Sequence, residues 1–225
     1  MKAVILAAGR GTRMRHLTRR TPKPLLKVQG RTFIERLIGV LPPEVDEVIV
    51  VIGYRGEQIQ KFLGSSFGGK KVSYVTNDQI SLGNAHSLML TRGQFKLRER
   101  FVVLYSDEIV SKKEIAECLL HRCSWLTHIV EDSEKMSVAV VSPSGRITNV
   151  EEKPERKISN LVPGGVLVIN ADIFKCRLRQ HRNGEYYLTS MMSEFIKTHS
   201  VKAVAGTKNL YFSTPEDIDR FNKTK

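Results

Sequence analysis

Apolar runs of strand length alternate along this chain with segments of helical period, and this alternation constrains the fold more than any other feature. In the first half, strands are predicted over residues 2–6, 47–52, 71–75 and 101–105, and helices over residues 32–41, 55–63 and 84–91. The helix over residues 55–63 is expected to face inward with Ile59, Phe62 and Leu63. Parallel strands need a long crossover between them, usually a helix. The order therefore predicts a parallel sheet with helices on its faces.

The second half continues the pattern with less regular spacing. Helices are predicted over residues 112–122 and 188–199, and strands over residues 137–141, 146–150, 166–169 and 202–204. Thr214 with Pro215 in the first turn indicates the start of a last short helix. No linker breaks the chain, and 225 residues suit one large domain. We expect residues 1–225 to form a single α/β domain with a Rossmann-like, mixed and mostly parallel sheet.

Several protein classes are excluded by what the chain lacks. No apolar run approaches the ~18 residues that would span a bilayer. Gly9 and Arg10 end the apolar opening too early for a secretory signal. The three cysteines are an odd number without metal-ligand spacing, which is typical of reduced thiols. We expect a cytoplasmic protein, not a membrane protein or a disulfide scaffold, and no membrane partner.

The chain carries a net charge of +13, which favours anionic partners. The densest basic cluster runs from Arg10 to Lys27. Such an excess attracts nucleic acid or phosphorylated small molecules. The sequence contains no nucleic-acid recognition module and no interleaved aromatic residues in the basic cluster, so we expect no nucleic-acid partner.

The segment from Leu6 to Lys27 has the composition of a phosphate-binding loop. A strand delivers Gly9 and Gly11, and the loop then carries Arg13 and Lys23. Glycines let backbone N–H groups approach a phosphate chain, and the cations neutralise it. The third glycine of the dinucleotide fingerprint is missing, and no Gly-Lys-Ser/Thr follows. The segment therefore matches neither of the two commonest phosphate-binding motifs.

This segment instead resembles the sugar-1-phosphate nucleotidyltransferases, also called NDP-sugar pyrophosphorylases. The resemblance begins with Leu-Ala-Ala-Gly-x-Gly-Thr-Arg-Met at residues 6–14 and continues through Thr18, Pro22–Leu26, Gly30 and Ile34-Glu35. Further matching motifs are Gly83–His86, Ser106-Asp107, Glu151–Pro154, Gly165 and Thr214–Asp217. Together they cover the family's catalytic domain only, without the β-helical domain that some members append.

The resemblance implies a Mg²⁺-dependent reaction in which a sugar-1-phosphate attacks the α-phosphorus of an NTP, giving an NDP-sugar and pyrophosphate. The nucleophile is already an anion at pH 7, so no general base is required. Catalysis then consists of bringing two polyanions together and neutralising the developing charge. The resemblance assigns the β- and γ-phosphates to Arg13, the attacking phosphate and α-phosphate to Lys23, and Mg²⁺ to Asp107.

The remaining implied contacts divide into two groups. The nucleotide-binding residues are expected to be Leu6, Ala7, Ala8, Gly9, Gly11, Thr12, Arg13, Gln79, Gly83 and Asp107. The acceptor-binding residues are expected to be Lys23, Glu152, Lys153 and Gly165, with Glu152 on sugar hydroxyls and Lys153 on the sugar's phosphate.

The chain departs from the family pattern at three positions. Asn84 replaces a threonine in the base-binding turn, and Pro163 stands where asparagine or threonine is usual. Tyr211 stands where the family often has a second metal-binding aspartate. Either Mg²⁺ is held by Asp107 with substrate phosphates and water, or the metal binds weakly.

Two other functions remain open. The acceptor could be a phosphorylated alcohol, such as phosphocholine or an inositol phosphate, or the chain could be a non-catalytic nucleotide-binding regulator of the same fold. The sequence does not specify the base or the sugar, and a homodimer is one of the oligomeric states that stay open.

Two apparent motifs are set aside. Gly64–Lys71 resembles a Walker A loop but has Lys71 where a hydroxyl belongs. Cys118, His121 and Cys123 lack a fourth zinc ligand, and we expect core thiols and a surface histidine.

Overall fold

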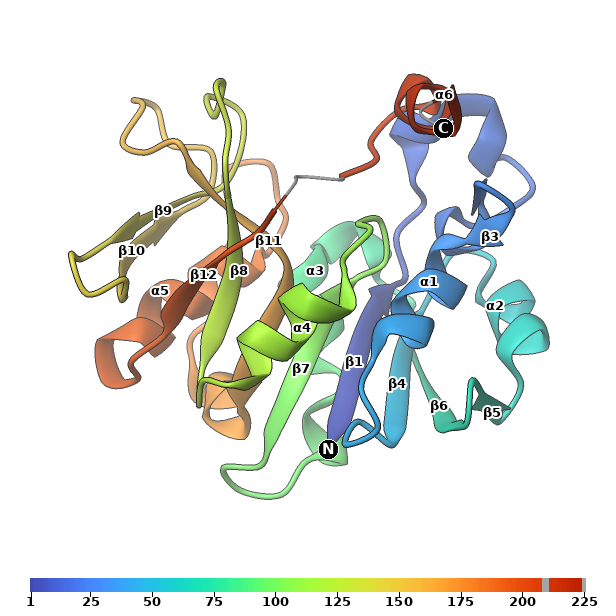
Figure 1. The fold of residues 1–225 in the computed structure, drawn as a ribbon, viewed down its shortest axis with the longest axis horizontal. Helices are drawn as coiled ribbons and strands as arrows, with labels where there is room; N and C mark the ends of the chain where they lie inside the picture. The colour runs from blue at the N-terminus through green and yellow to red at the C-terminus, as the bar shows by residue number, and fades with distance from the viewer. Residues whose placement is uncertain (208–210, 224–225) are drawn as a thin grey trace.

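The computed structural model describes residues 1–207 and 211–223 and has a central eight-stranded sheet (Figure 1). The strand order across the sheet is β12-β8-β11-β7-β1-β4-β6-β5. The strands are β1 (Lys2–Ala7), β4 (Glu47–Ile52), β5 (Ser66–Phe67), β6 (Lys70–Thr76), β7 (Arg100–Tyr105), β8 (Ser124–Ile129), β11 (Leu161–Asn170) and β12 (Lys202–Ala205).

Strand directions confirm the mixed, mostly parallel sheet. Strand β1 pairs in parallel with β4 and β7, β4 pairs in parallel with β6, and β12 pairs in parallel with β8. Strand β11 runs against β7 and β8, and β5 runs against β6. The chain passes from β1 to β4 and β6 on one side, and then to β7 on the other side of β1. This reversal of strand order is where open α/β sheets bind ligands, beyond the carboxyl ends of the strands.

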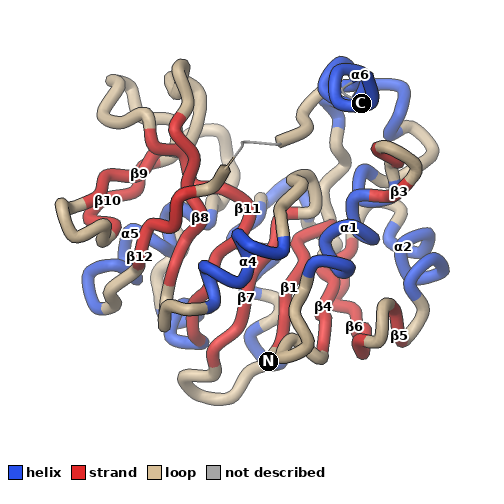
Figure 2. The backbone as a smooth tube through the Cα atoms, viewed as in Figure 1, coloured by secondary structure: helices blue, strands red, loops and turns tan. Residues whose placement is uncertain are grey.

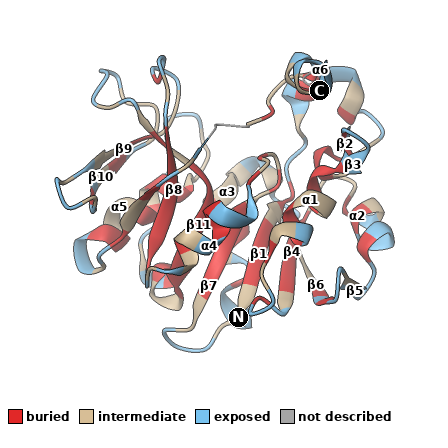
Figure 3. Cartoon of the chain, in the orientation of Figure 1, coloured by how far each residue is buried: buried red, intermediate tan, exposed pale blue. Residues whose placement is uncertain are grey.

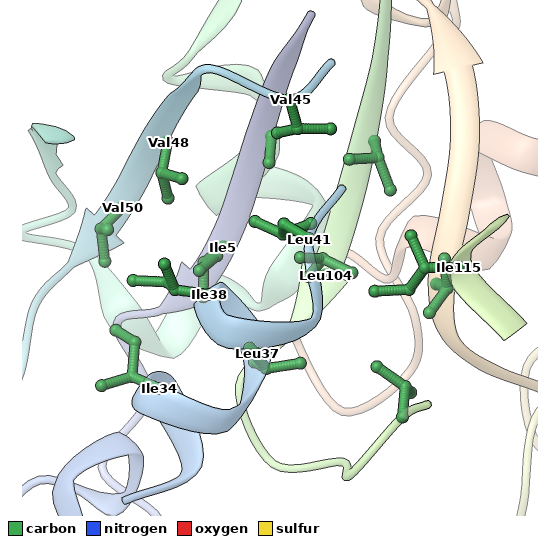
Figure 4. Close-up of a cluster of buried hydrophobic side chains, with 14 of the residues drawn as sticks. Ile5, Ile34, Leu37, Ile38, Leu41, Val45, Val48, Val50, Leu104 and Ile115 are labelled. Carbon is green, nitrogen blue, oxygen red and sulfur yellow. The ribbon is translucent and has the colours of Figure 1, made fainter. Parts of the chain in front are cut away.

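Helices cover both faces of the sheet (Figure 2). One face packs on α1 (Phe33–Val40), α2 (Gly56–Leu63) and α4 (Lys112–Leu119), and the other packs on α3 (Asn84–Met89) and α5 (Leu188–Thr198). The central strands are buried along most of their length (Figure 3). In the first core cluster, Ile34, Leu37 and Ile38 of α1 pack over Ile5 and Leu104 of the sheet (Figure 4).

Helix α1 begins with a capping box. The Thr32 hydroxyl accepts the Glu35 backbone N–H at 3.2 Å, and the Glu35 carboxylate accepts the Thr32 backbone N–H at 2.7 Å. The backbone hydrogen bond from Thr32 is the main cause that lowers the pKa of Glu35. The Ile34-Glu35 pair of the family pattern therefore has a structural role at the start of a helix.

Loss of this cap gives a stability prediction. Thr32→Ala is expected to lower the free energy of unfolding by about 1 kcal/mol, measured by urea denaturation at pH 7.

The carboxylate of Glu35 gives the same cap a dependence on pH. Because the pKa of Glu35 is depressed in the folded state, its contribution to the free energy of unfolding is complete above its unfolded pKa. The contribution is lost as pH falls through the folded value. The stability difference between wild type and Glu35→Gln should therefore shrink in acid; a difference that grows below pH 4.5 would contradict this assignment.

The C-terminal half adds a hairpin and a returning helix. Strands β9 (Val138–Val141) and β10 (Ile147–Glu151) pair antiparallel against α5, and α6 (Pro215–Lys223) lies near the short hairpin β2–β3 (Lys27–Val28 and Arg31–Thr32) (Figure 1). Short 3₁₀ segments are η1 (Thr12–Thr18), η2 (Lys23–Leu25), η3 (Ile80–Leu82), η4 (Arg92–Gln94) and η5 (Ala171–Lys175). The predicted start of the last helix at Thr214-Pro215 agrees with the structure.

Two expectations about local structure were wrong. Residues 120–122 are not helical, and the following strand β8 was not predicted. Phe62, expected to face inward from α2, is 39% exposed, whereas Ile59 and Leu63 are buried. None of the helices in residues 1–207 and 211–223 has the length and the apolar character that a bilayer span requires.

Candidate active site

A cleft of about 720 Å³ opens at the carboxyl ends of β1 and β7. Its walls come from the loops after β1 and β7, the turn before α3, the segment after β10 and the start of α5. The predicted residues that line it are Leu6, Ala8, Gly9, Gly11, Arg13, Lys23, Gly83, Asp107, Glu152 and Lys153. Side chains far apart in the sequence therefore meet at one place.

The loop after β1 is held in shape by close packing around Gly11. This residue has a positive φ of 62°, and a Cβ atom there would lie 3.1 Å from Cβ of Lys23. The Thr18 hydroxyl donates to the Gly11 carbonyl at 2.9 Å, and Tyr54 donates to the Thr18 carbonyl at 2.9 Å. Glycine is the residue that meets both demands, the left-handed backbone and the contact with Lys23.

Lys23 and Asp107 form an ion pair in the cleft. The Lys23 Nζ atom donates to Oδ2 of Asp107 at 2.8 Å, and Lys23 is only 8% exposed. One residue comes from the loop after β1 and the other follows β7, so the pair joins the two strands that flank the reversal of order. A buried ammonium at this position attracts phosphate oxygens strongly because water screens it little.

Tyr211 lies against both cations of the loop. Arg13 donates to its hydroxyl at 2.7 Å, and the Lys23 Nζ atom lies 5.3 Å from the centre of its ring. Burial, and next the negative charge of Asp107, raise the pKa of Tyr211, so the phenol is neutral at pH 7. The position expected from the family pattern to carry an acid therefore holds an uncharged group beside Asp107.

Glu108, the residue after Asp107, is buried in the wall of the cleft. Its Oε2 atom accepts the backbone N–H of Gly165 at 2.5 Å, and burial raises its pKa to about 8. A Cβ atom at Gly165 would lie 2.7 Å from the same oxygen. Gly165, predicted to bind the acceptor, is thus engaged with Glu108 and does not line the cleft.

The opposite wall carries Glu152 and Lys153. The Glu152 carboxylate accepts hydrogen bonds from Ser137 at 2.5 Å and Thr189 at 3.0 Å. The Lys153 Nζ atom lies 3.7 Å from Oε1 of Glu152 and donates to the Tyr187 hydroxyl at 3.0 Å. Both side chains are therefore oriented by neighbours from the start of α5.

The turn before α3 is fastened to this wall. The Asn84 side-chain oxygen accepts the backbone N–H of Leu188 at 2.8 Å, and Tyr186 exchanges backbone hydrogen bonds with Leu82 and Ala85. The asparagine that replaces the family's threonine therefore links the two halves of the cleft. Asn77, two residues before Gln79, is buried and donates to the Ser87 hydroxyl.

Some predicted residues lie outside the cleft wall, and others were missed. Ala7, Thr12 and Gln79 do not line the cleft, and Gln79 is exposed. Residues that line it without having been predicted include Glu108, His128, Asn183, Glu185, Tyr187 and Thr189. His128 lies on β8, a strand that the sequence did not predict, and Glu108 directly follows Asp107. The other four lie between residues 183 and 189, where the sequence carries no recognisable motif.

The two apparent motifs set aside have structural explanations. Lys70, in the Walker-like segment, is buried and donates to the carbonyls of Pro42 and Val45. Cys118 and Cys123 are buried free thiols, and His121 is half-buried. Among the residues that the structure describes, no group of three or more His, Cys, Asp or Glu side chains could hold a metal ion.

The fold and the cleft define a class of α/β protein whose site lies at the switch point of the sheet, with the cations Arg13 and Lys23 supplied by the loop after β1. Residues 2–211 match the family described as nucleotidyl transferase, and the chain belongs to this family. Its members generally use a divalent metal ion.

Individual relatives agree with this membership. The chain is 30% identical to UTP–glucose-1-phosphate uridylyltransferase AglF of Haloferax volcanii, with 88% of this chain and 84% of that protein covered. It is 26% identical to the bifunctional protein GlmU of Methanocaldococcus jannaschii, covering 91% of this chain and 49% of GlmU. The chain thus spans about half the length of that relative.

A solved structure supports the fold. UDP-glucose pyrophosphorylase complexed with UDP-glucose superposes with a TM-score of 0.83 at 20% identity, covering 98% of this chain and 96% of that one.

Proposed function

We propose that the protein condenses an NTP with a sugar-1-phosphate to give an NDP-sugar and pyrophosphate. The observation that carries this proposal is the Lys23–Asp107 pair, which lies beside Arg13 in a cleft whose other wall presents Glu152 and Lys153. Such a cleft can hold two phosphorylated ligands with cations around them. The family membership and the uridylyltransferase relative support the same reaction.

In this reaction the two cations act on different phosphates. Arg13 binds the β- and γ-phosphates that leave as pyrophosphate, and Lys23 binds the attacking phosphate and the α-phosphate. The nucleophile needs no proton removed, so these residues contribute by orienting the two phosphates and by stabilising the charge that builds up between them. Glu152 accepts hydrogen bonds from the sugar hydroxyls, and Lys153 binds the sugar's phosphate.

The residues present fit a Mg²⁺ ion that is bound largely through the substrate. Asp107 supplies one carboxylate at the cleft, and its Oδ2 atom is shared with Lys23. Mg²⁺ is commonly held by one or two carboxylates together with substrate phosphates and several waters. When bound, the ion would neutralise the charge on the triphosphate. The free, mostly buried cysteines support a cytoplasmic location.

The test is a matrix of five nucleoside triphosphates against several sugar-1-phosphates, with pyrophosphate release measured. Phosphocholine and inositol phosphates belong in the same panel because they are the alternative acceptors. We expect release to require both an NTP and a sugar-1-phosphate. Release only with a phosphorylated alcohol would change the acceptor class, and nucleotide binding without any release would support a non-catalytic regulator.

Glu152→Ala is expected to raise the KM for the acceptor about 10- to 100-fold while the KM for the NTP changes little. This range corresponds to loss of hydrogen bonds to a charged group. The matched control is Glu151→Ala, since Glu151 is the exposed neighbour at the end of β10 and does not line the cleft. Equal weakening of both substrates would assign Glu152 a purely structural role through Ser137 and Thr189.

A further inference from the structure

His128 occupies an unusual position in the wall of the cleft. It lies near the end of β8, is 5% exposed and borders the cleft together with Pro163. In the order of the sheet, β8 lies two places beyond β7 and away from the β1 loop. His128 therefore belongs to the half of the cleft that the acceptor would occupy.

The Nδ1 atom of His128 is buried and has no hydrogen-bond partner within residues 1–207 and 211–223. A neutral imidazole carries one N–H group, and a protonated one carries two. A proton on Nδ1 would leave a buried donor unpaired, which is the costlier arrangement. Burial also lowers the pKa of the ring, although the charge of Glu114 opposes this, so the ring is neutral. The single N–H proton of the neutral ring therefore belongs on Nε2.

Two glycines fix the position of the ring. A Cβ atom at Gly164 would lie 2.7 Å from Nε2, and a Cβ atom at Gly206 would overlap the other edge of the ring. An irregularity in β11 between Pro163 and Leu167 brings Gly164 to this place, and Trp125 holds it by donating to its carbonyl at 2.8 Å. A ring fixed this closely, with its buried Nδ1 atom left without a partner among the described residues, is costly to maintain for packing alone.

We propose that His128 determines acceptor specificity by donating a hydrogen bond from Nε2–H to an oxygen of the bound sugar-1-phosphate. This inference rests on the proposed function and deepens it. A fixed neutral donor selects an acceptor that presents an oxygen at one position and discriminates against an analogue that lacks it. The charged residues Lys153 and Glu152 recognise the phosphate and other hydroxyls, so His128 adds a separate contact.

Two substitutions separate the two ring nitrogens. The amide nitrogen of glutamine can reach the place of Nε2, whereas that of asparagine reaches only the place of Nδ1. His128→Asn is expected to raise the KM for the acceptor about tenfold, with the KM for the NTP unchanged, and His128→Gln should stay within about threefold of wild type. Equal effects of the two variants, or equal effects on both substrates, would overturn the proposal.

Deoxy analogues of the sugar-1-phosphate identify the oxygen. One analogue should lose about tenfold in kcat/KM with the wild type but show no such loss with His128→Asn, because the same hydrogen bond is already missing. If every analogue is affected alike in wild type and variant, His128 donates to none of these oxygens, and the proposal fails.

¹⁵N NMR of the histidine ring gives a readout that does not depend on turnover. The free protein should show His128 as the neutral tautomer protonated on Nε2, and addition of the best sugar-1-phosphate should shift that nitrogen. If no sugar-1-phosphate reacts, each member of the panel is added in turn. A missing reaction contradicts the proposed function, whereas a proton on Nδ1, or an Nε2 signal unmoved by a bound acceptor, contradicts the role of His128.

Discussion

Lys23→Ala is expected to lower turnover by roughly 10²–10³, because one fixed charge aimed at a developing charge typically contributes that much. The ammonium is buried, 2.8 Å from Asp107, and water cannot replace it efficiently in a cleft of this kind. If Lys23 acts mainly on the transition state, kcat falls with kcat/KM, and the KM for each substrate changes less. The measurement is pyrophosphate release over a range of both substrates.

The matched control for this variant is Lys27→Ala. Lys27 is an exposed lysine on β2, close to Lys23 in sequence, and it does not line the cleft. Its removal lowers the net charge equally, so it separates the local effect from general attraction of anions. Thermal unfolding of both variants checks that the fold is intact. Turnover at the wild-type rate in folded Lys23→Ala would remove this residue from the mechanism.

The regular elements of the first half could be predicted because each carries a strong local signal. Strand β4 has the predicted ends, since Val48–Ile52 is buried and a buried parallel strand reads as a continuous apolar run. Helix α1 combines an apolar face with the capping box at Thr32 and with Pro42 beyond its end. In such segments, local preference and tertiary burial agree.

Strand β8 could not be predicted because its local signals conflict. Ser124–Ile129 mixes apolar residues with Thr127 and His128, and it follows a helical pattern that continues past the end of α4. Phe62 was placed inward by its helical period, yet it lies near Phe67 at the edge of the sheet. These outcomes depend on which strands pair and which helix face is covered, and both are set by contacts distant in sequence.

The candidate site divides in the same way. The residues drawn from motifs, Arg13, Lys23, Asp107, Glu152 and Lys153, all meet in the cleft. The support around them was not readable, because it consists of tertiary contacts such as Arg13 with Tyr211 and Asn84 with Leu188. A glycine of the pattern, Gly165, is placed against Glu108, which shows that a motif residue can serve the site by supporting a neighbour.

The second large effect concerns the metal. Asp107→Asn is expected to lower turnover by at least ~10², because asparagine removes the carboxylate at the cleft that the family pattern assigns to Mg²⁺ and leaves Lys23 without its partner. The measurement is the rate of pyrophosphate release across a Mg²⁺ series, together with calorimetric binding of the NTP with and without Mg²⁺. A variant that keeps wild-type rates at every Mg²⁺ concentration would show that the metal is bound elsewhere.

Tyr211→Asp tests the same site in the opposite direction. The neutral phenol of Tyr211 is a poor Mg²⁺ ligand, and it lies close enough to Asp107 for that charge to raise its pKa. A second carboxylate here should lower the Mg²⁺ concentration that gives the half-maximal rate, because the number of carboxylates sets much of a site's affinity for a hard cation. Tyr211→Phe is the control: it removes the hydroxyl that Arg13 contacts but adds no metal ligand, so the Mg²⁺ requirement should stay unchanged. If Tyr211→Asp and Tyr211→Phe have the same Mg²⁺ requirement, position 211 does not face the ion, and the triphosphate and Asp107 hold it without help from the C-terminal segment.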